Sequence, residues 1–369
     1  MKLEVNKEKI VAAISKAEKI ATKNSTLPAL SCLLFEFSND VLNIKSTNLD
    51  LSISVSVRIK GGESKSILVP ASTLNSFILN LPKSDSKIEF DIDGNNLHIT
   101  SESTDTTINT QPIDDFPIIS DDKSSKSFKI NSGDITKGLS SVWYSTAISS
   151  IKPELSSVYA YHDDGDLVFV ATDSFRLAEK RISVKNSENF ENILIPYKNV
   201  VEIVRILDDI DEEITLYFKE DKLIICTENL TIISRIVEGN FPDYGQILPK
   251  ETKTVVTVLK EDLSQALKIS NVFTDKFNQV IFSIFPEDGI FEINSNANGV
   301  GETKNILKSK ITGENIKIAF NSKYIIDCFS SIKSDSVDLK FNGFDRPMII
   351  QGSNDKSFLY LVSNINVGR

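Results

Sequence analysis

The sequence predicts an α+β protein built from three tandem, similar domains, each with two helices packed on antiparallel sheets. The main observation is that one order of strand and helix signals occurs three times along the 369 residues. A chain of this length favours two or three domains. Its composition, 40% hydrophobic and 25% charged, is that of an ordinary globular protein with enough apolar residues for several cores.

Each copy starts with a short strand that runs into a helix signal. These starts lie at residues 3–10, 128–135 and 256–263, with offsets of 125 (128 − 3) and 128 (256 − 128). A second helix lies in the middle of each copy and follows a short apolar strand. Its apolar residues are spaced three and four apart, which predicts one buried helix face. They are Leu74, Phe77, Ile78 and Leu81, then Val200, Ile203, Val204 and Leu207, then Tyr324, Ile325, Cys328 and Phe329.

A hairpin with strand alternation follows each mid-copy helix. The strand pairs are 88–92 with 97–99, 214–218 with 223–225, and 337–341 with 348–350; their Asp-Gly, Glu-Asp and Asn-Gly turns suit tight hairpins. Phe116-Pro117 and Phe241-Pro242 close the first two copies. Polar linkers at 120–127 and 249–254 then divide the chain into domains 1–122, 128–249 and 255–369.

The bulk charge and the cysteines limit the class of protein. A formal charge of −10 argues against nucleic-acid binding over the whole surface, but it allows a local basic lining. Cys32, Cys226 and Cys328 are far apart and odd in number, which favours a reducing compartment. The first residues lack the apolar core of a signal peptide, and no run approaches the roughly 18 apolar residues of a membrane span. We therefore expect a soluble, cytoplasmic protein with no membrane partner.

Catalytic and metal-binding patterns are missing from the sequence. His98 and His162 lie in different domains, and there is no phosphate loop or dinucleotide fingerprint, so we expect neither catalysis nor a cofactor. Residues 91–95 approach a calcium loop, but Asn96 takes the required glycine position, which favours a hairpin turn. The acidic run 208–213 is more typical of a solvated loop than of a magnesium site. We expect no bound metal.

Basic residues recur on equivalent helices. On any single helix they are typical of a solvated face, but their recurrence favours a mildly basic lining that attracts phosphates without reading bases. The candidates for this phosphate-attracting lining are Lys19, Lys23, Lys137, Lys198, Arg205 and Lys268.

The segment 171–182, ATDSFRLAEKRI, follows an apolar strand at 167–170. Residues Thr172–Arg176, which are polar apart from Phe175, allow two interpretations. One is a plain strand-to-strand turn capped by Asp173 and Ser174. The other is a surface site that a rigid strand holds in place.

Four motifs decide between these interpretations: TLPAL at 26–30, ATDSFRLA at 171–178, EGNFPDY at 238–244 with ILP at 247–249, and YLV at 360–362. Together they resemble the bacterial DNA polymerase III β subunit family, the β sliding clamps, over the whole chain. The resemblance implies the DNA-clamp fold and a head-to-tail homodimeric ring, with six domains around double-stranded DNA and helices inside. It also implies a non-catalytic processivity factor.

The same resemblance implies a groove between the second and third domains. It would dock short peptides of the replicative polymerase α subunit, the clamp loader, other polymerases and repair proteins. The matching residues are Leu155, Thr172, Ser174, Phe175, Arg176, Leu177, Pro242, Ile247, Phe277, Asn321, Tyr324, Leu361 and Val362. Family members often have Gly-His at 174–175, Arg at Gln246, and Met-Pro-Met at 363–365, so a changed peptide preference is expected.

The ring contact in this family joins the first domain of one copy to the third domain of the other. The corresponding segments are 104–110 and 271–273, with contacts at Thr106, Ile108, Val272 and Phe273; Thr106 replaces a common phenylalanine.

Two alternative functions remain at this point. One is an acidic protein-binding scaffold that never encircles DNA. The other is a carboxylate-dependent hydrolase, which is weaker because no acid and base form a recognisable pair.

Overall fold

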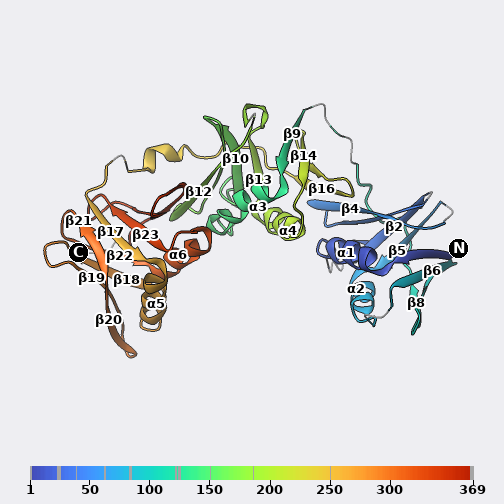
Figure 1. Cartoon of the computed structure of the whole chain (residues 1–369), viewed down its shortest axis with the longest axis horizontal. Coiled ribbons are helices and arrows are strands. Elements are labelled where there is room, and N and C mark those ends of the chain that lie inside the picture. Colours follow the sequence, from blue (N-terminus) through green and yellow to red (C-terminus); the bar gives the residue numbers. More distant parts are fainter. Residues whose placement is uncertain are drawn as a thin grey trace. The chain divides into compact units, whose positions relative to one another are not determined.

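The computed structural model describes residues 2–22, 26–38, 40–61, 64–82, 85–120, 123, 126–149, 151–185, 187–249 and 251–365. The chain divides into two compact units (Figure 1). Unit 1 comprises Met1–Gly133 and Val201–Ile236, and unit 2 comprises Asp134–Val200 and Val237–Arg369. Helices α3 (Ser132–Ser140) and α4 (Tyr197–Leu207) each pass from one unit to the other.

Unit 1 contains two antiparallel sheets. The larger has the order β5-β2-β3-β4-β16-β15-β14-β9, and the smaller has the order β1-β6-β7-β8. The larger sheet consists of β5 (Lys65–Pro70), β2 (Cys32–Ser38), β3 (Val41–Thr47), β4 (Leu51–Arg58), β16 (Leu230–Arg235), β15 (Lys222–Cys226), β14 (Glu213–Phe218) and β9 (Ser127–Asn131). The smaller consists of β1 (Lys2–Asn6), β6 (Lys87–Asp93), β7 (Asn96–Thr100) and β8 (Asp105–Asn109).

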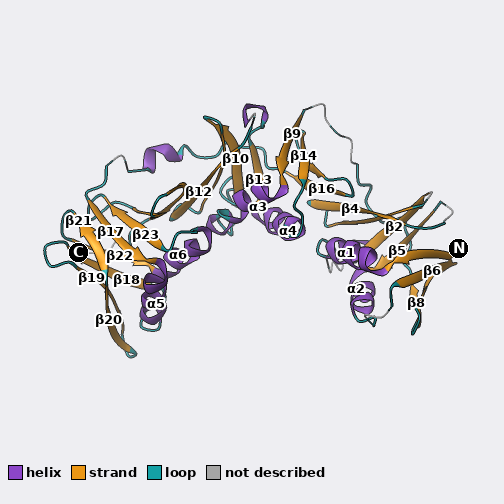
Figure 2. Cartoon of the chain, in the orientation of Figure 1, coloured by secondary structure: helices purple, strands orange, loops and turns teal. Residues whose placement is uncertain are grey.

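Helix α1 (Lys7–Glu18) shows how the sequence builds unit 1. The Asn6 side chain caps its start by accepting a hydrogen bond from the Lys9 amide at 3.0 Å. Its buried residues are Ile10, Ala13, Ile14 and Ala17, the one-sided spacing of an amphipathic helix. This face packs on β2, β3 and β4, and β4 alternates buried and half-buried residues along its length. Helix α2 (Ala71–Leu79) packs beside α1, and a short turn of 3₁₀ helix, Pro28–Ser31, precedes β2 (Figure 2).

Unit 2 also contains two antiparallel sheets, with orders β13-β10-β11-β12-β25-β24-β23-β17-β21 and β20-β19-β18-β22. The larger sheet consists of β13 (Ile193–Pro196), β10 (Ser157–Asp163), β11 (Asp166–Thr172), β12 (Arg176–Ser183), β25 (Asp355–Val362), β24 (Met348–Gly352), β23 (Ser336–Phe341), β17 (Thr254–Leu259) and β21 (Ser309–Thr312). The smaller consists of β20 (Gly301–Leu307), β19 (Ile290–Ala297), β18 (Gln279–Phe285) and β22 (Ile316–Asn321).

Helices α5 (Lys260–Asn271) and α6 (Ser322–Asp327) lie wholly in unit 2 and contact each other; α5 also packs on β17, β18, β19 and β20. A 3₁₀ turn, Cys328–Ser331, continues from α6. Further 3₁₀ turns are Trp143–Ser145, Ser187–Asn189 and Tyr244–Ile247. No helix among the described residues is both long and apolar enough to span a membrane.

The threefold repeat is visible in where the strands start. Strands β4, β12 and β20 begin at Leu51, Arg176 and Gly301, a constant spacing of 125 residues (176 − 51 and 301 − 176). The large sheets cross the boundaries that the sequence predicted between domains: β4 pairs with β16, and β12 pairs with β25. The periodic pattern did not predict these pairings, because it shows which face of a strand is buried but not which strand lies beside it.

The predicted hairpins form, but one of their turns differs from the expectation. Residues 94 and 95 make a two-residue turn with Gly94 at φ 55°, as the Asp-Gly signal predicts. The third hairpin is not tight, because β23 ends at Phe341 and β24 starts at Met348. Residues 342–347 form a longer loop there, with Gly343 at φ 107°. This loop leaves Phe344 exposed.

Candidate functional site

The turn between β11 and β12 is organised by two polar side chains. The Thr172 hydroxyl donates to the Arg176 carbonyl at 2.7 Å and accepts from the Ser174 amide at 3.1 Å. Asp173 Oδ1 accepts from the amides of Phe175 (2.9 Å) and Arg176 (3.0 Å). Ser174 has a left-handed φ of 76°, which is uncommon for a residue other than glycine. The Asp173 carboxylate therefore stabilises the turn.

The same turn occurs in the first repeat, between β3 and β4. Thr47 Oγ1 accepts from the Leu49 amide, Asn48 Oδ1 accepts from the Leu51 amide, and Leu49 has φ 78°. In the third repeat Gly299 takes the matching left-handed position, with φ 83°. The turn is thus a property of the repeat. Any function specific to the second copy must come from the side chains around that turn.

Arg176 is the first of those side chains, and each of its three guanidinium nitrogens donates a hydrogen bond. Its Nε donates to Asp173 Oδ2 at 2.9 Å, its Nη2 donates to the Tyr144 carbonyl at 2.7 Å, and its Nη1 donates to Asp327 Oδ2. The guanidinium also lies over the Tyr324 ring. With only 11% of the side chain exposed, Arg176 supports the site rather than offering free hydrogen-bond donors. Sequence reasoning missed Tyr144 and Asp327, which only the fold brings to Arg176.

The structure brings the C-terminal end of the described chain to this turn. Leu361 and Val362 of β25 pair with Leu177 and Arg176 of β12. The Ser363 amide then donates to the Phe175 carbonyl at 2.8 Å, and the Ile365 amide donates to the Ala319 carbonyl of β22 at 2.8 Å. The segment 363–365 therefore runs from the turn to the strand that carries Asn321. Asn321 in turn caps α6 by accepting from the amides of Lys323 and Tyr324.

The predicted groove residues divide into a buried and an exposed set. The buried set, which would form the floor of the predicted groove, is Leu155, Thr172, Leu177, Leu361 and Val362. The exposed set includes three large apolar side chains, Phe175 (61% exposed), Phe277 (58%) and Ile247 (51%). Ser174 and Pro242 are also exposed, and Arg176, Asn321 and Tyr324 are half-buried. Phe344, in the loop before Met348, is also 61% exposed. No sequence motif marked it.

The predicted DNA-facing cations all lie on helices or at helix ends and are exposed, apart from Lys23, which lies outside the described residues. Two of them have partners inside unit 1. The Lys19 ammonium donates to the Arg205 carbonyl at 2.8 Å, and the Arg205 guanidinium pairs with Glu202 at 3.1 Å. Lys137 on α3, Lys198 on α4 and Lys268 on α5 are exposed.

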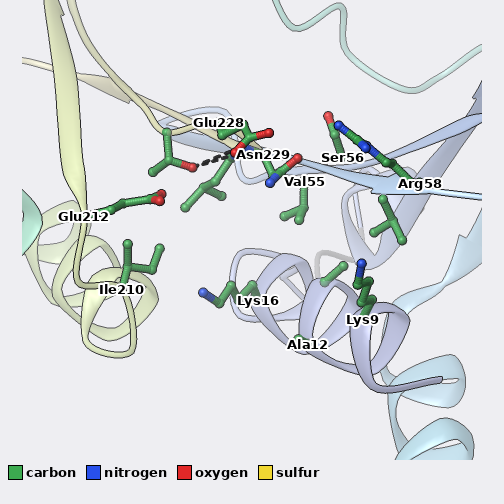
Figure 3. Close-up of a pocket in the computed structure, with 14 residues that line it drawn as sticks. Lys9, Ala12, Lys16, Val55, Ser56, Arg58, Ile210, Glu212, Glu228 and Asn229 are labelled. Atoms are coloured by element: carbon green, nitrogen blue, oxygen red, sulfur yellow. Dashed lines mark hydrogen bonds between the residues drawn. The ribbon is translucent and has the colours of Figure 1, made fainter. Parts of the chain in front are cut away.

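A cavity of about 520 Å³ lies within unit 1 beside α1 (Figure 3). Lys9 and Lys16 rise into it from α1, and Arg58 reaches it from β4. Glu212 and Glu228 line the opposite side, so the facing walls carry opposite charges. Lys16 also pairs with Asp209 at 2.9 Å. Arg58 is a cation that the helical pattern could not reveal, because it lies at the end of a strand.

The predicted dimer contacts differ in exposure. Val272 is 67% exposed at the end of α5, and Phe273 packs close to Gly301 at the start of β20. Ile108, by contrast, is 6% exposed within its own sheet, so its side chain is not available as an apolar surface contact. The alternation along β8 turns Ile108 inward, so the predicted dimer contact at this position would use the backbone of the strand. Thr106 is half-buried.

Among the residues that the structure describes, no three histidine, cysteine or acidic side chains are grouped as metal ligands would be. The calcium-like segment 91–95 lies in the β6–β7 hairpin. His98 Nδ1 shares a hydrogen bond with the Thr107 hydroxyl at 2.8 Å, within the sheet. His162 lies on β10, apart from His98 in the sequence and in a different unit.

Comparison with known proteins identifies the family. Models of the N-terminal, central and C-terminal domains of the DNA polymerase III beta subunit match residues 1–120, 129–243 and 245–366 in that order. The chain is 24% identical to the Beta sliding clamp of Rickettsia bellii, with all of both chains covered, and 24% identical to that of Bacillus subtilis, with 98% of each covered.

Solved structures agree with this match. The Thermotoga maritima DNA polymerase III beta subunit superposes with a TM-score of 0.93 at 26% identity, and a Pseudomonas aeruginosa sliding clamp bound to griselimycin with 0.93 at 22% identity. Both comparisons cover 100% of each chain. Three domains of this fold define a DNA sliding clamp, a processivity factor rather than a catalytic subunit. The chain belongs to the DNA polymerase III β subunit family. Proteins of this family bind DNA and the replicative polymerase.

Proposed function

We propose that two copies of this chain close head to tail into a ring around duplex DNA, with β8 of one copy paired to β20 of the other. The repeat carries this proposal. Strands β8, β16 and β25 start at Asp105, Leu230 and Asp355, again 125 residues apart (230 − 105 and 355 − 230). β16 pairs with β4 and β25 with β12, so each repeat joins the next through equivalent strands. Among the described strands, β8 and β20 are the equivalent pair left at sheet edges.

The exposed edge and apolar side chains of β20 support its pairing with a second copy. An exposed strand edge readily pairs with another chain, and proteins normally cover or protect it. β20 is seven residues long. Val300, which directly precedes the strand, and Ile306, which lies in it, are both 65% exposed. Val272 adds a third exposed apolar side chain near Phe273 and Gly301. A head-to-tail contact that closes gives a ring rather than a filament.

The exposed cations on α3, α4 and α5 suit a non-specific contact with the DNA backbone. An overall charge of −10 keeps such contacts weak, which agrees with a protein that must slide. The predicted domains 1–122, 128–249 and 255–369 would each contribute helices to this inner surface. We place the finished ring in the cytoplasm, with the DNA it encircles.

The groove in unit 2 would bind short peptides of the replicative polymerase α subunit, the clamp loader, other polymerases and repair proteins. Its buried apolar floor and exposed apolar rim suit an extended peptide with large apolar side chains. Phe175 stands where family members often have histidine and gives this chain a more apolar rim than the family pattern, which favours aromatic or long aliphatic peptide residues. Griselimycin, with which a related clamp has been crystallised, is a further ligand that can be used to test binding at this groove.

Sedimentation of the intact chain tests the ring. The wild type should sediment as a dimer, twice the 41.0 kDa of one copy. The double variant V272D/I306D should sediment as a monomer, because it places two charges at the proposed contact. Ile151→Asp, at another exposed isoleucine, is the matched control and should remain a dimer. A strictly monomeric wild type at micromolar concentration would overturn the ring.

Retention on DNA separates a ring from an acidic scaffold. After loading by a clamp loader, the wild type should stay on a nicked circular plasmid and leave once the plasmid is linearised. The V272D/I306D variant should not be retained on either form. Equal retention of both proteins on linear and circular DNA would show ordinary surface binding instead of encirclement.

A further inference from the structure

Residues 237–249, here called the connecting segment, link the two halves of unit 2 and carry the groove residues Pro242 and Ile247. None of the residues in this segment is buried, and apart from the 3₁₀ turn it has no regular structure. Long-range hydrogen bonds at Val237 and Tyr244 tie the segment to the larger sheet of unit 2. The Val237 amide donates to the Leu194 carbonyl at 2.9 Å, and the Tyr244 hydroxyl reaches β12.

The Tyr244 hydroxyl takes part in a partly buried network of charged side chains. It donates to Glu179 Oε2 at 2.5 Å. The other carboxylate oxygen, Glu179 Oε1, accepts from Arg181 Nε at 2.8 Å, and Arg181 also pairs with Asp163 at 2.9 Å. The Glu179 side chain is only 9% exposed. A hydrogen bond to a carboxylate is among the stronger ones in proteins.

Tyr161 completes the network. Its hydroxyl lies 2.7 Å from the Tyr244 hydroxyl. Because the single proton of Tyr244 is donated to Glu179, Tyr161 must be the donor in this second bond. The Tyr244 ring meets Phe241 edge-on, and Phe241 stacks on Tyr159 at 5.2 Å. These rings pack on Leu177 and Leu361, the same buried residues that form the groove floor.

We infer that Glu179 is a positioning residue for the groove: through Tyr244 it holds the connecting segment, and with it Pro242 and Ile247, over the floor before any peptide arrives. This inference rests on the proposed function of the groove. Glu179 itself does not touch the peptide.

The physical reason is preorganisation. The segment packs on the sheet only through Phe241, Tyr244 and Leu248, and none of its residues is fully buried, so without the Tyr244 hydroxyl it would sample other conformations more often. A peptide that binds between this segment and the floor would then have to order it, and the lost entropy would weaken binding. The hydroxyl of Tyr244 removes that cost in the free protein. Loss of the hydroxyl should act mainly on the dissociation rate, as most interface changes do.

The test measures binding of a fluorescent synthetic peptide taken from the polymerase α subunit. Tyr244→Phe keeps the ring in its cluster and removes only the hydroxyl. We expect it to weaken peptide binding roughly three- to tenfold, through faster dissociation, with the dimer unchanged. Tyr217→Phe, on β14 in unit 1, is the matched control and should bind like the wild type. Peptide affinity of Tyr244→Phe equal to that of the wild type would overturn the inference.

A double-mutant cycle adds a readout that a general loss of stability would not reproduce. Glu179→Gln should weaken binding in the wild-type background but have little further effect in Tyr244→Phe, because the two side chains act through one bond. Fully additive effects would contradict the proposed route through Tyr244. Amide hydrogen exchange should rise in residues 237–249 of Tyr244→Phe and stay unchanged in Tyr217→Phe. A wild type that binds no peptide would instead refute the groove itself.

Discussion

The guanidinium carbon of Arg176 lies 4.5 Å from the centre of the Tyr324 ring, while its nitrogens bind Asp173, Asp327 and the Tyr144 carbonyl. One side chain thus joins the β11–β12 turn to α6 and to the 3₁₀ turn at 143–145. Tyr324 is tied in turn to β25, because its carbonyl accepts a hydrogen bond from the Tyr360 hydroxyl at 2.8 Å. Arg176 holds together the elements around the groove.

Replacing Arg176 by lysine should destabilise unit 2 although the charge is kept. An ammonium cannot reproduce the planar fork or the stacking on Tyr324, so at least one of the carboxylates loses its partner. We expect the free energy of unfolding to fall by about 2–3 kcal/mol in denaturant titrations. Arg205→Lys, at an exposed pair with Glu202, should change it by less than about 0.5 kcal/mol. Equal effects at the two positions would contradict this account.

Ser174→Gly should stabilise the chain modestly. Ser174 has φ 76°, a conformation that costs a non-glycine residue about 1–2 kcal/mol, and glycine recovers this at an entropic cost of about 0.5–1 kcal/mol. The expected net gain is about 0.5 kcal/mol, measured by denaturant titration. Ser174→Ala keeps the Cβ atom and should give no such gain. If alanine stabilises as much as glycine, strain at this position is not the cause.

Alanine at the exposed rim of the groove should reduce peptide affinity without lowering stability. Phe277→Ala and Ile247→Ala should each cost about 1–4 kcal/mol in binding free energy, with unchanged thermal midpoints. Leu177→Ala should behave differently, because Leu177 is fully buried in the floor. It should lower the free energy of unfolding by about 2–5 kcal/mol. Rim variants that bind the peptide as the wild type does would show that the groove is misplaced.

Unit 2 should lose stability at high pH. Burial raises the pKa of Tyr144 and Tyr360 well above the usual value, and burial together with the neighbouring Glu179 carboxylate raises the pKa of Tyr244. The stability from these neutral phenols is fully present below the unfolded pKa of about 10 and is lost as the pH rises above it. Thermal midpoints should therefore fall between about pH 10 and 11.5, and a flat profile there would contradict the burial of these phenols.

Removing exposed cations should weaken retention on DNA in a salt-dependent way. Lys137→Ala and Lys198→Ala remove charges on α3 and α4. For each phosphate that is no longer neutralised, the slope of log affinity against log salt should become shallower by about 0.9. Glu202→Ala, on α4 near Arg205, is a control of opposite charge and should not make that slope shallower. An unchanged slope in the double lysine variant would show that these side chains do not face DNA.

The sequence by itself determined the three repeats, the two helices of each and the hairpins, because hydrophobic spacing reports directly which face of an element is buried. It also contained the turn residues Thr172 and Asp173, whose hydrogen bonds are local and need no distant partner. The motifs at 171–178, 238–244 and 360–362 were sufficient to indicate the family, which the matches to all three domain models confirm.

Only the tertiary structure decided how the repeats join and what each site residue does. Strand pairing between β4 and β16, and between β12 and β25, depends on long-range register that spacing does not encode. Leu177 and Ile108 are buried because other parts of the fold cover their side of the sheet, which the sequence pattern alone does not reveal. Arg176 and Glu179 take their roles from partners up to 151 residues away, such as Asp327. Local sequence cannot specify such contacts, because they exist only once the chain has folded.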